Sequence, residues 1–328
     1  MATGKPNKKK GKTQPGAVSP TSPIPRSATR IVRVALIQMR CGDSPGENLS
    51  RALEKIKEAA ARGASIVCLP ELFRTRYFCQ SEDDACFALA EPIPGETTQL
   101  LSRAAASSKV VLIGSVFERR TDGLYHNTAV TFDASGRMLG KYRKMHIPDD
   151  PCYYEKFYFT PGDAAPAFPA IVTSAARIAT LVCWDQWFPE AARVAALNGA
   201  QIIFYPTAIG WHLKDPAALK QAQTDAWELI QRSHALANGC FVCAVNRVGR
   251  EGELNFWGGS FVADPFGRVI ARASAVGEEM LMAECDLEQI DYTRRHWPFL
   301  RDRRVDAYGG LLQRFIDSPL PQSVQKKS

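Results

Sequence analysis

The 328-residue sequence has no apolar run that approaches the ~20 residues of a membrane-spanning helix, which argues against a membrane protein. Its basic N-terminus is not followed by the apolar segment of a secretory signal. Three common motifs are also absent: a GxSxG nucleophile elbow, a GxxxxGK(S/T) phosphate-binding loop and the histidine spacing of a metal site. The five histidines are scattered, so the sequence assigns neither a metal centre nor a cysteine–histidine pair.

Acidic residues are missing from the chain before Asp43, and the N-terminal region is rich in Lys, Pro, Ser, Thr and Gly. The seven positive charges of residues 1–30 equal the formal net charge of +7, so the rest of the chain is close to neutral. We therefore expect residues 1–29 to form a disordered basic tail, and we expect no nucleic-acid binding by the folded part. Weak binding of the tail to a polyanion is the alternative.

A disulfide framework is not expected, because the chain has nine cysteines, an odd number. Several lie inside apolar runs, as Cys68 does in IVCLP. The single CxxC pair, Cys240 and Cys243, falls in an apolar run without a second pair of metal ligands, so burial is its simplest interpretation. Free thiols are typical of a reducing compartment, and we expect a cytoplasmic protein.

What the sequence does contain is an alternation of short apolar strands and helices. Predicted strands cover 31–38, 64–70, 109–118, 176–183, 201–206 and 240–246, with two more around each of the turns at 133–136 and 265–267. Predicted helices cover 47–62, 97–107 and 219–238, and another begins near 189. The two similar halves predict an α/β fold of two sheets packed face to face with helices outside. Since no linker divides them, we expect one domain at 30–312 and a C-terminal tail at 313–328.

Cys183 ends a predicted buried strand, where a rigid sheet can hold a reactive group in place. The helix that begins near Pro189 follows it closely. We therefore expect a partly exposed thiol that faces a helix N-terminus, two conditions that favour the thiolate. A small buried core residue is the alternative, because free cysteine is often buried.

Glu71 also follows a predicted buried strand, IVCLP. A carboxyl group among apolar neighbours is expected to have a raised pKa, which suits a general base near neutral pH. The alternative is a turn residue that forms an ion pair with Arg74 or Arg76.

Two further charged residues lie in the middle of the chain. Lys144, in GKYRKMHIP, belongs either to a solvated basic face or, aimed inward, to a site that stabilises a developing oxyanion. Glu155 stands among aromatic residues in YYEKFYF, and its alternative is an exposed ion pair with Lys156.

Three segments that contain these residues resemble the catalytic blocks of the nitrilase, or carbon–nitrogen hydrolase, superfamily. They are CLPELF at 68–73, YRKMHIP at 142–148 and VCWDQWFPEAAR at 182–193. Their order also matches, and the likeness extends over roughly 31–312. The resemblance implies a four-layer α-β-β-α sandwich that associates with a second copy, with no metal or organic cofactor.

The resemblance also implies a role for each residue in the hydrolysis of a non-peptide C–N bond. Cys183 would attack the carbonyl carbon while Glu71 takes its proton, and a thioester-like intermediate would then be cleaved by water. Lys144 and the backbone N–H of Trp184 would hold the oxyanion. Glu155 would orient the partners of Glu71 or the substrate nitrogen.

Within that superfamily, the segments at 149–159, 205–210 and 299–304 resemble those of N-carbamoylputrescine amidases. The resemblance implies a small-molecule substrate, and the predicted substrate-binding residues are Tyr77, Asp149, Trp211 and His212. One difference concerns the last two, because many members have Ser-Glu there to meet the distal ammonium group of the substrate. Other acidic residues that would supply the charge are Asp149, Asp150, Asp215 and Asp225.

Several alternatives stay open. A β-ureidopropionase-like or ω-amidase activity needs a cation for a substrate carboxylate, and Arg76 or Arg247 would provide it. A different class of protein is a catalytically silent binding module whose tail recruits a polyanion. The segment from His296 to Tyr308 is expected to reach a neighbouring copy, by the resemblance.

Overall fold

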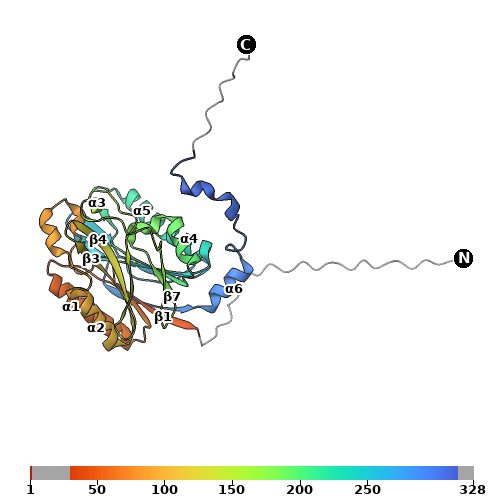
Figure 1. Ribbon diagram of the computed structural model, residues 1–328, viewed down its shortest axis with the longest axis horizontal. Helices are drawn as coiled ribbons and strands as arrows, with labels where there is room; N and C mark the ends of the chain where they lie inside the picture. Colours follow the sequence, from red (N-terminus) through yellow and green to blue (C-terminus); the bar gives the residue numbers. More distant parts are fainter. Residues whose placement is uncertain (2–29, 317–328) are drawn as a thin grey trace, which may run out of the picture.

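The computed structural model describes Met1 and residues 30–316, and its core is formed by two six-stranded sheets (Figure 1). The first sheet has the order β15-β1-β2-β3-β4-β5 and the second has the order β14-β13-β10-β8-β7-β6. The strands of the first sheet are β1 (Ile31–Gln38), β2 (Ile66–Cys68), β3 (Val111–Thr121), β4 (Leu124–Phe132), β5 (Met138–Arg143) and β15 (Glu279–Asp286). Those of the second are β6 (Ala170–Val172), β7 (Arg177–Thr180), β8 (Ile202–Thr207), β10 (Phe241–Asn246), β13 (Phe261–Ala263) and β14 (Val269–Arg272).

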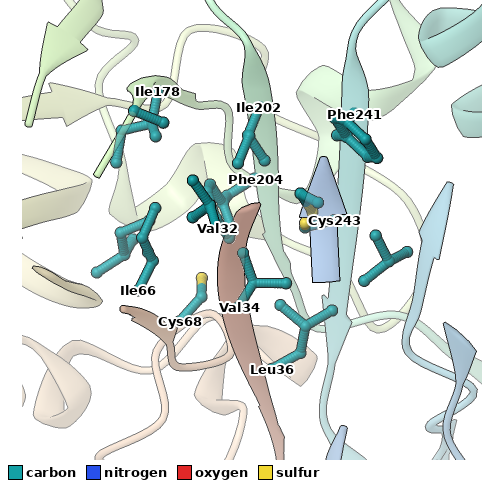
Figure 2. Packing of buried hydrophobic residues seen from close by; sticks show 14 of the residues in the cluster. Val32, Val34, Leu36, Ile66, Cys68, Ile178, Ile202, Phe204, Phe241 and Cys243 are labelled. Atoms are coloured by element: carbon teal, nitrogen blue, oxygen red, sulfur yellow. The ribbon is translucent and has the colours of Figure 1, made fainter. Parts of the chain in front are cut away.

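The side chains of each strand alternate between two cores, which fixes the order of the layers. In β1, Val34 and Leu36 pack between the two sheets with residues of the second sheet such as Phe204 (Figure 2). The intervening Ala35 and Ile37 pack on the other face, against helices. The predicted α-β-β-α sandwich is therefore confirmed.

The outer layers are helical. Helices α1 (Pro45–Ala61) and α2 (Glu96–Ser108) cover the first sheet, whereas α4 (Pro189–Leu197) and α5 (Ala217–Asn238) cover the second (Figure 1). Helix α1 begins where Ser44 Oγ accepts a hydrogen bond from the Glu47 N–H, and its buried residues recur every three or four positions.

A third sheet, which the sequence did not predict, has the order β11-β12-β9. Its strands are short: β9 (Gly210–His212), β11 (Val248–Glu251) and β12 (Leu254–Trp257). The hairpin between β11 and β12 turns at Gly252, whose φ of 57° favours glycine. Strands of three or four residues give too little alternation for a pattern to predict them.

Short helical segments complete the chain. They are α3 (Glu155–Tyr158), α6 (Glu288–His296) and the 3₁₀ turns Phe78–Gln80, Asp84–Leu89, Cys183–Trp187, Val305–Ala307 and Gly309–Leu312. Residues 297–316 leave the body of the sandwich after α6 (Figure 1). No helix in the described part of the chain has both the length and the apolar character needed to cross a membrane.

Most predicted elements are present, within a few residues of the predicted bounds. The exception that matters is the strand before Cys183, because β7 ends at Thr180 and Cys183 opens a 3₁₀ turn. All nine cysteines are unpaired, and Cys68, Cys240 and Cys243 are buried in the cores as predicted. The predicted N-terminal tail at 1–29, except Met1, lies outside the described residues, as does the C-terminal tail beyond residue 316.

Candidate active site

Glu71 lies at the end of the first sheet, three residues after β2, and is fully buried. Its Oε1 accepts hydrogen bonds from Asn127 Nδ2 at 2.7 Å and from Lys144 Nζ at 2.9 Å. Its Oε2 is buried and accepts no hydrogen bond from any residue that the structure describes. The alternative ion pairs do not form, since Arg74 contacts Glu91 and Glu96, and Arg76 contacts Asp43.

Lys144 points inward at the end of β5, and none of its surface is exposed. Its Nζ donates to Glu71 Oε1 at 2.9 Å and to Glu155 Oε2 at 2.6 Å. Burial disfavours the ammonium form, but the negative charges of Glu155 and Glu71 outweigh it, so the pKa of Lys144 is raised well above its ordinary value. The solvated basic face is therefore ruled out for this residue.

Glu155 is the first residue of α3 and is also fully buried. Besides the contact with Lys144, its Oε1 accepts a hydrogen bond of 2.7 Å from the Tyr77 hydroxyl. Burial raises the pKa of Glu155 to about 7; Lys144 lowers it and Glu71 raises it further. Lys156 contacts Asp149 at 3.9 Å, so the exposed ion pair with Glu155 does not form.

Cys183 lies in the 3₁₀ turn with a φ of 44°, and only 4% of its surface is exposed. The expectation of a partly exposed thiol at a strand end is wrong, because the strand stops early and the turn folds the side chain inward. Burial, followed by the charge of Glu71, raises the pKa of the Cys183 thiol well above its ordinary value, while Lys144 opposes the rise. The thiol therefore carries its proton at neutral pH and needs a base to become nucleophilic.

The buried carboxylate of Asp185 ties the turn of Cys183 to the segment that follows Lys144. Its Oδ2 accepts from the Val182 N–H at 2.9 Å and from the Tyr142 hydroxyl at 2.8 Å. Its Oδ1 lies 3.0 Å from the backbone nitrogen of His146 and 2.7 Å from its Nδ1. The three-dimensional structure thus joins segments about 40 residues apart that carry the thiol and the ammonium group.

A cavity of about 780 Å³ opens beside Cys183. Its walls come from the loops after β5 and β7, from the three-stranded sheet and from one face of α5. Among the described residues that line the cavity there is no Lys or Arg, whereas two are acidic, Asp150 and Asp215. The electrostatic character of the cavity mouth therefore suits a cation better than an anion.

Trp184, predicted to hold the oxyanion, and His212, predicted to bind the substrate, both line this cavity. Trp211 does not, because consecutive side chains of β9 point to opposite faces. Its ring packs on Trp257, with ring centroids 5.3 Å apart, and its Nε1 donates to the Lys220 carbonyl of α5 at 2.9 Å. The predicted place of Trp211 at the cavity mouth is therefore wrong.

Tyr77 and Asp149, also predicted to bind the substrate, do not line this cavity. Tyr77 is buried behind Glu155 and has no face on the cavity. Asp149 is exposed and points toward Lys156, whereas its neighbour Asp150 lines the cavity. Of the other acidic residues that the sequence offered, Asp215 lines the cavity, whereas Asp225 is exposed on α5 and is not among the lining residues.

Neither arginine that the carboxylate-binding alternatives needed reaches the cavity. Arg76 is half exposed and pairs with Asp43 at 2.9 Å. Arg247 is fully buried, and its guanidinium binds the Glu251 carboxylate and backbone carbonyls of the loop after β2.

Three aromatic residues of the cavity were missed by sequence analysis, Tyr153, Trp187 and Trp257. Trp187 lies four residues after Cys183, inside the motif at 182–193. No spacing in the sequence distinguishes a tryptophan that lines a cavity from one in the core. Among residues 30–316, no group of three or more His, Cys, Asp or Glu side chains is arranged to hold a metal ion.

The carbon–nitrogen hydrolase family model matches residues 33–295, which include all the buried residues described above. The chain belongs to the carbon–nitrogen hydrolase family. It is 40% identical over 291 residues to the N-carbamoylputrescine amidase of Solanum lycopersicum, covering 86% of this chain and 95% of that relative. It is 38% identical over 289 residues to a citrullinase of Francisella tularensis, covering 87% and 99%.

The solved structures agree with the family. A carbon–nitrogen hydrolase from Helicobacter pylori G27 has a TM-score of 0.84 and 46% identity, covering 87% of this chain and all of that one. The hydrolase described here is therefore an amidohydrolase that cleaves carbon–nitrogen bonds other than peptide bonds in small molecules. The alternative of a catalytically silent binding module does not fit this membership.

Proposed function

We propose that the enzyme hydrolyses N-carbamoylputrescine to putrescine, CO2 and ammonia. The observation that carries the proposal is the cavity next to Cys183, whose charged lining residues in the described chain are the acidic Asp150 and Asp215. A ureido group at the thiol would leave the distal ammonium group of the substrate among these carboxylates, where opposite charges attract. The relatives named N-carbamoylputrescine amidase support the same substrate.

The first half of the proposed reaction forms a bond between Cys183 and the ureido carbon. Glu71 Oε2, which is free of hydrogen bonds within the described protein, takes the thiol proton as Sγ attacks. Lys144 Nζ and the Trp184 N–H stabilise the negative charge that develops on the carbonyl oxygen. The C–N bond to the terminal nitrogen then breaks, and Glu71 returns the proton so that ammonia leaves.

The second half releases the enzyme. Glu71 takes a proton from water, whose oxygen attacks the carbon of the thiocarbamate, and the C–S bond breaks as the proton passes to Sγ of Cys183. The product is a carbamate, which loses CO2 to give putrescine. Glu155 is proposed to act indirectly, because it holds Lys144 through a contact of 2.6 Å while its other oxygen binds Tyr77.

Substrates with a carboxylate are less suitable for this cavity. A β-ureidopropionase or ω-amidase substrate would bring a negative charge into a lining without Lys or Arg in the described residues. Citrulline, the substrate named for one relative, has the ureido and ammonium groups but adds a carboxylate. These compounds therefore serve as discriminating substrates.

The test is ammonia release from N-carbamoylputrescine, citrulline and 3-ureidopropionate by the wild type and by Cys183→Ala. We expect rapid release from the first compound and slower release from the other two. The variant should release none, because Cys183 is the one cysteine among the described residues that line the cavity. Wild-type activity on a carboxylate compound alone would reject the named substrate. Near wild-type turnover by Cys183→Ala would reject the mechanism.

We also propose that the enzyme associates with further copies of itself in the cytoplasm and binds no nucleic acid. Support for association comes from residues 297–316, where Trp297, Phe299, Leu311 and Leu312 are exposed. Apolar side chains gathered on one segment outside the body are typical of a contact surface. The free thiols support the cytoplasmic location. The near-neutral net charge of the residues after 30 supports the absence of nucleic-acid binding.

A further inference from the structure

We propose that the buried ion pair of Arg247 and Glu251 is a positioning device that holds the catalytic loop of residues 71–77. Both residues lie outside the three motif segments and outside the cavity lining. The inference rests on the proposed function, because it assumes that Glu71 is the general base. It assigns the two residues an indirect role through Glu71 and Glu155.

The first half of the device is the guanidinium group of Arg247, which reaches 176 residues back along the chain. Its Nη2 donates to the carbonyl oxygen of Glu71 at 2.7 Å and to that of Leu72 at 3.0 Å. Its Nη1 donates to the carbonyl of Thr75 at 3.3 Å. One planar group therefore binds the backbone of the base itself and of two further residues in the loop.

The second half is the carboxylate of Glu251, at the end of β11. Both of its oxygens lie within 3.0 Å of Arg247 Nη1. Its Oε2 also accepts from the Tyr77 N–H at 2.7 Å, and the Tyr77 hydroxyl donates to Glu155. The pair thus binds the backbone of Glu71 directly and the backbone of Tyr77, whose side chain contacts Glu155.

The loop needs such support because its backbone is strained near the base. Leu72 has a φ of 47°, a left-handed conformation that is unfavourable for a non-glycine residue and persists only when surrounding contacts impose it. Arg247 donates hydrogen bonds to the carbonyl oxygens of Glu71 and Leu72, and the Leu72 N–H donates a third to Ser115 Oγ at 3.2 Å.

A lysine cannot replace this arginine, although it keeps the charge. The guanidinium binds a carboxylate and three carbonyls from two nitrogens held in one plane, whereas an ammonium group donates from a single atom. The arginine also lies over the rings of Phe256 and Tyr77, with its Cζ 5.3 Å and 6.0 Å from the ring centroids. We therefore expect Arg247→Lys to keep the buried positive charge but to let the loop of residues 71–77 shift.

The test compares Arg247→Lys and Glu251→Gln with two control variants, Arg268→Lys and Asp264→Asn. The control pair is also four residues apart in sequence with a buried carboxylate, but it lies at the turn between β13 and β14. All four variants are assayed for the melting temperature, kcat and KM for N-carbamoylputrescine, and the rate of iodoacetamide reaction at Cys183.

A displacement of the base by about 1 Å is expected to lower kcat by ~100-fold. We expect this loss in Arg247→Lys and Glu251→Gln, with KM changed less than about threefold, because neither residue lines the cavity. The alkylation of Cys183 is expected to slow by a similar factor, since the same base takes the thiol proton. The controls are expected to lower the melting temperature and leave kcat within about twofold of the wild type.

All four variants are compared at a temperature at which they are folded. If kcat changes equally in the Arg247 and Glu251 variants and in the two controls, Arg247 and Glu251 act only on stability and the inference is overturned. Alkylation separates this outcome from failure of the proposed function. If the wild type does not release ammonia from N-carbamoylputrescine, slowed alkylation in Arg247→Lys and Glu251→Gln alone still supports the device. Unchanged alkylation in all four variants rejects it.

Discussion

At the scale of single residues, the central feature is a buried lysine held between two buried carboxyl groups. Lys144 keeps its charge because Glu71 and Glu155 compensate the burial, and both carboxyl groups in turn stay close to an ammonium group. Glu155 has both oxygens occupied by donors, Lys144 Nζ and the Tyr77 hydroxyl, which is the pattern of an ionised carboxylate.

The pKa of Glu155 gives a prediction about pH. Its value of about 7 means that the group gains a proton as the pH falls through about 7, and the protonated form no longer accepts from both donors. We therefore expect kcat to fall as the pH is lowered through about 7. In Glu155→Gln, which cannot titrate, kcat is expected to be ~10²-fold lower and to lose this step. The measurement is kcat as a function of pH, from about one unit below to about one unit above the pKa of Glu155.

The same shift fixes the sign of a stability effect. Between about 4.5 and about 7, the folded protein holds a proton that the unfolded chain has released. Glu155 therefore makes the free energy of unfolding decrease as the pH rises through that window. This part of the decrease should disappear in Glu155→Gln and persist in Glu253→Gln, a change of an exposed carboxylate. Equal pH slopes in all three proteins would contradict the assignment.

At the scale of elements, the three-stranded sheet and α5 decide which side chains meet the substrate. The alternation along β9 sends His212 into the cavity and Trp211 toward α5. The loop after β9 then brings Asp215 to the same wall, where its Oδ2 lies 3.2 Å from the backbone nitrogen of His212. Asp215 thus places a carboxylate beside His212 at the cavity wall.

Asp215→Asn is expected to raise KM for N-carbamoylputrescine by about tenfold, with kcat changed much less. The reason is that removing one partner of a charge pair costs of order 1.4 kcal/mol, or a factor of ten in binding. Asp225→Asn is the matched control, because Asp225 lies on α5 outside the cavity lining. Steady-state kinetics with both variants tests the assignment, and equal KM values for the two would remove Asp215 from the substrate site.

At the scale of the whole molecule, residues 297–316 leave the sandwich after α6 and carry several exposed apolar side chains. Leu312 is 93% exposed and Phe315 is 77% exposed, values that are uncommon for large apolar side chains unless a partner covers them. We expect the double variant Leu312→Asp, Phe315→Asp to have a lower mass than the wild type in light scattering.

Val276→Asp is the control for that experiment, because Val276 is 80% exposed but lies between β14 and β15 on the sandwich. It is expected to leave the mass unchanged. A wild-type monomer, or the same mass for all three proteins, would contradict the proposed contact.

The sequence by itself determined the layers of the fold and the four buried residues of the site. Strand and helix patterns are local, so β1, β8 and α5 were predicted close to their observed bounds. The motifs that contain Glu71, Lys144 and Cys183 are contiguous segments, and the resemblance to a family rests on such segments.

Only the tertiary structure decided which side chains share a cavity and what holds the loops. Whether Trp211 or His212 faces the substrate depends on the register of β9 against β12, and Asp150 and Asp149 differ only in which side of a loop they occupy. The contact of Arg247 with Glu71 spans 176 residues. Such contacts are set by the packing of the sheets and loops, and no periodicity in the chain encodes them.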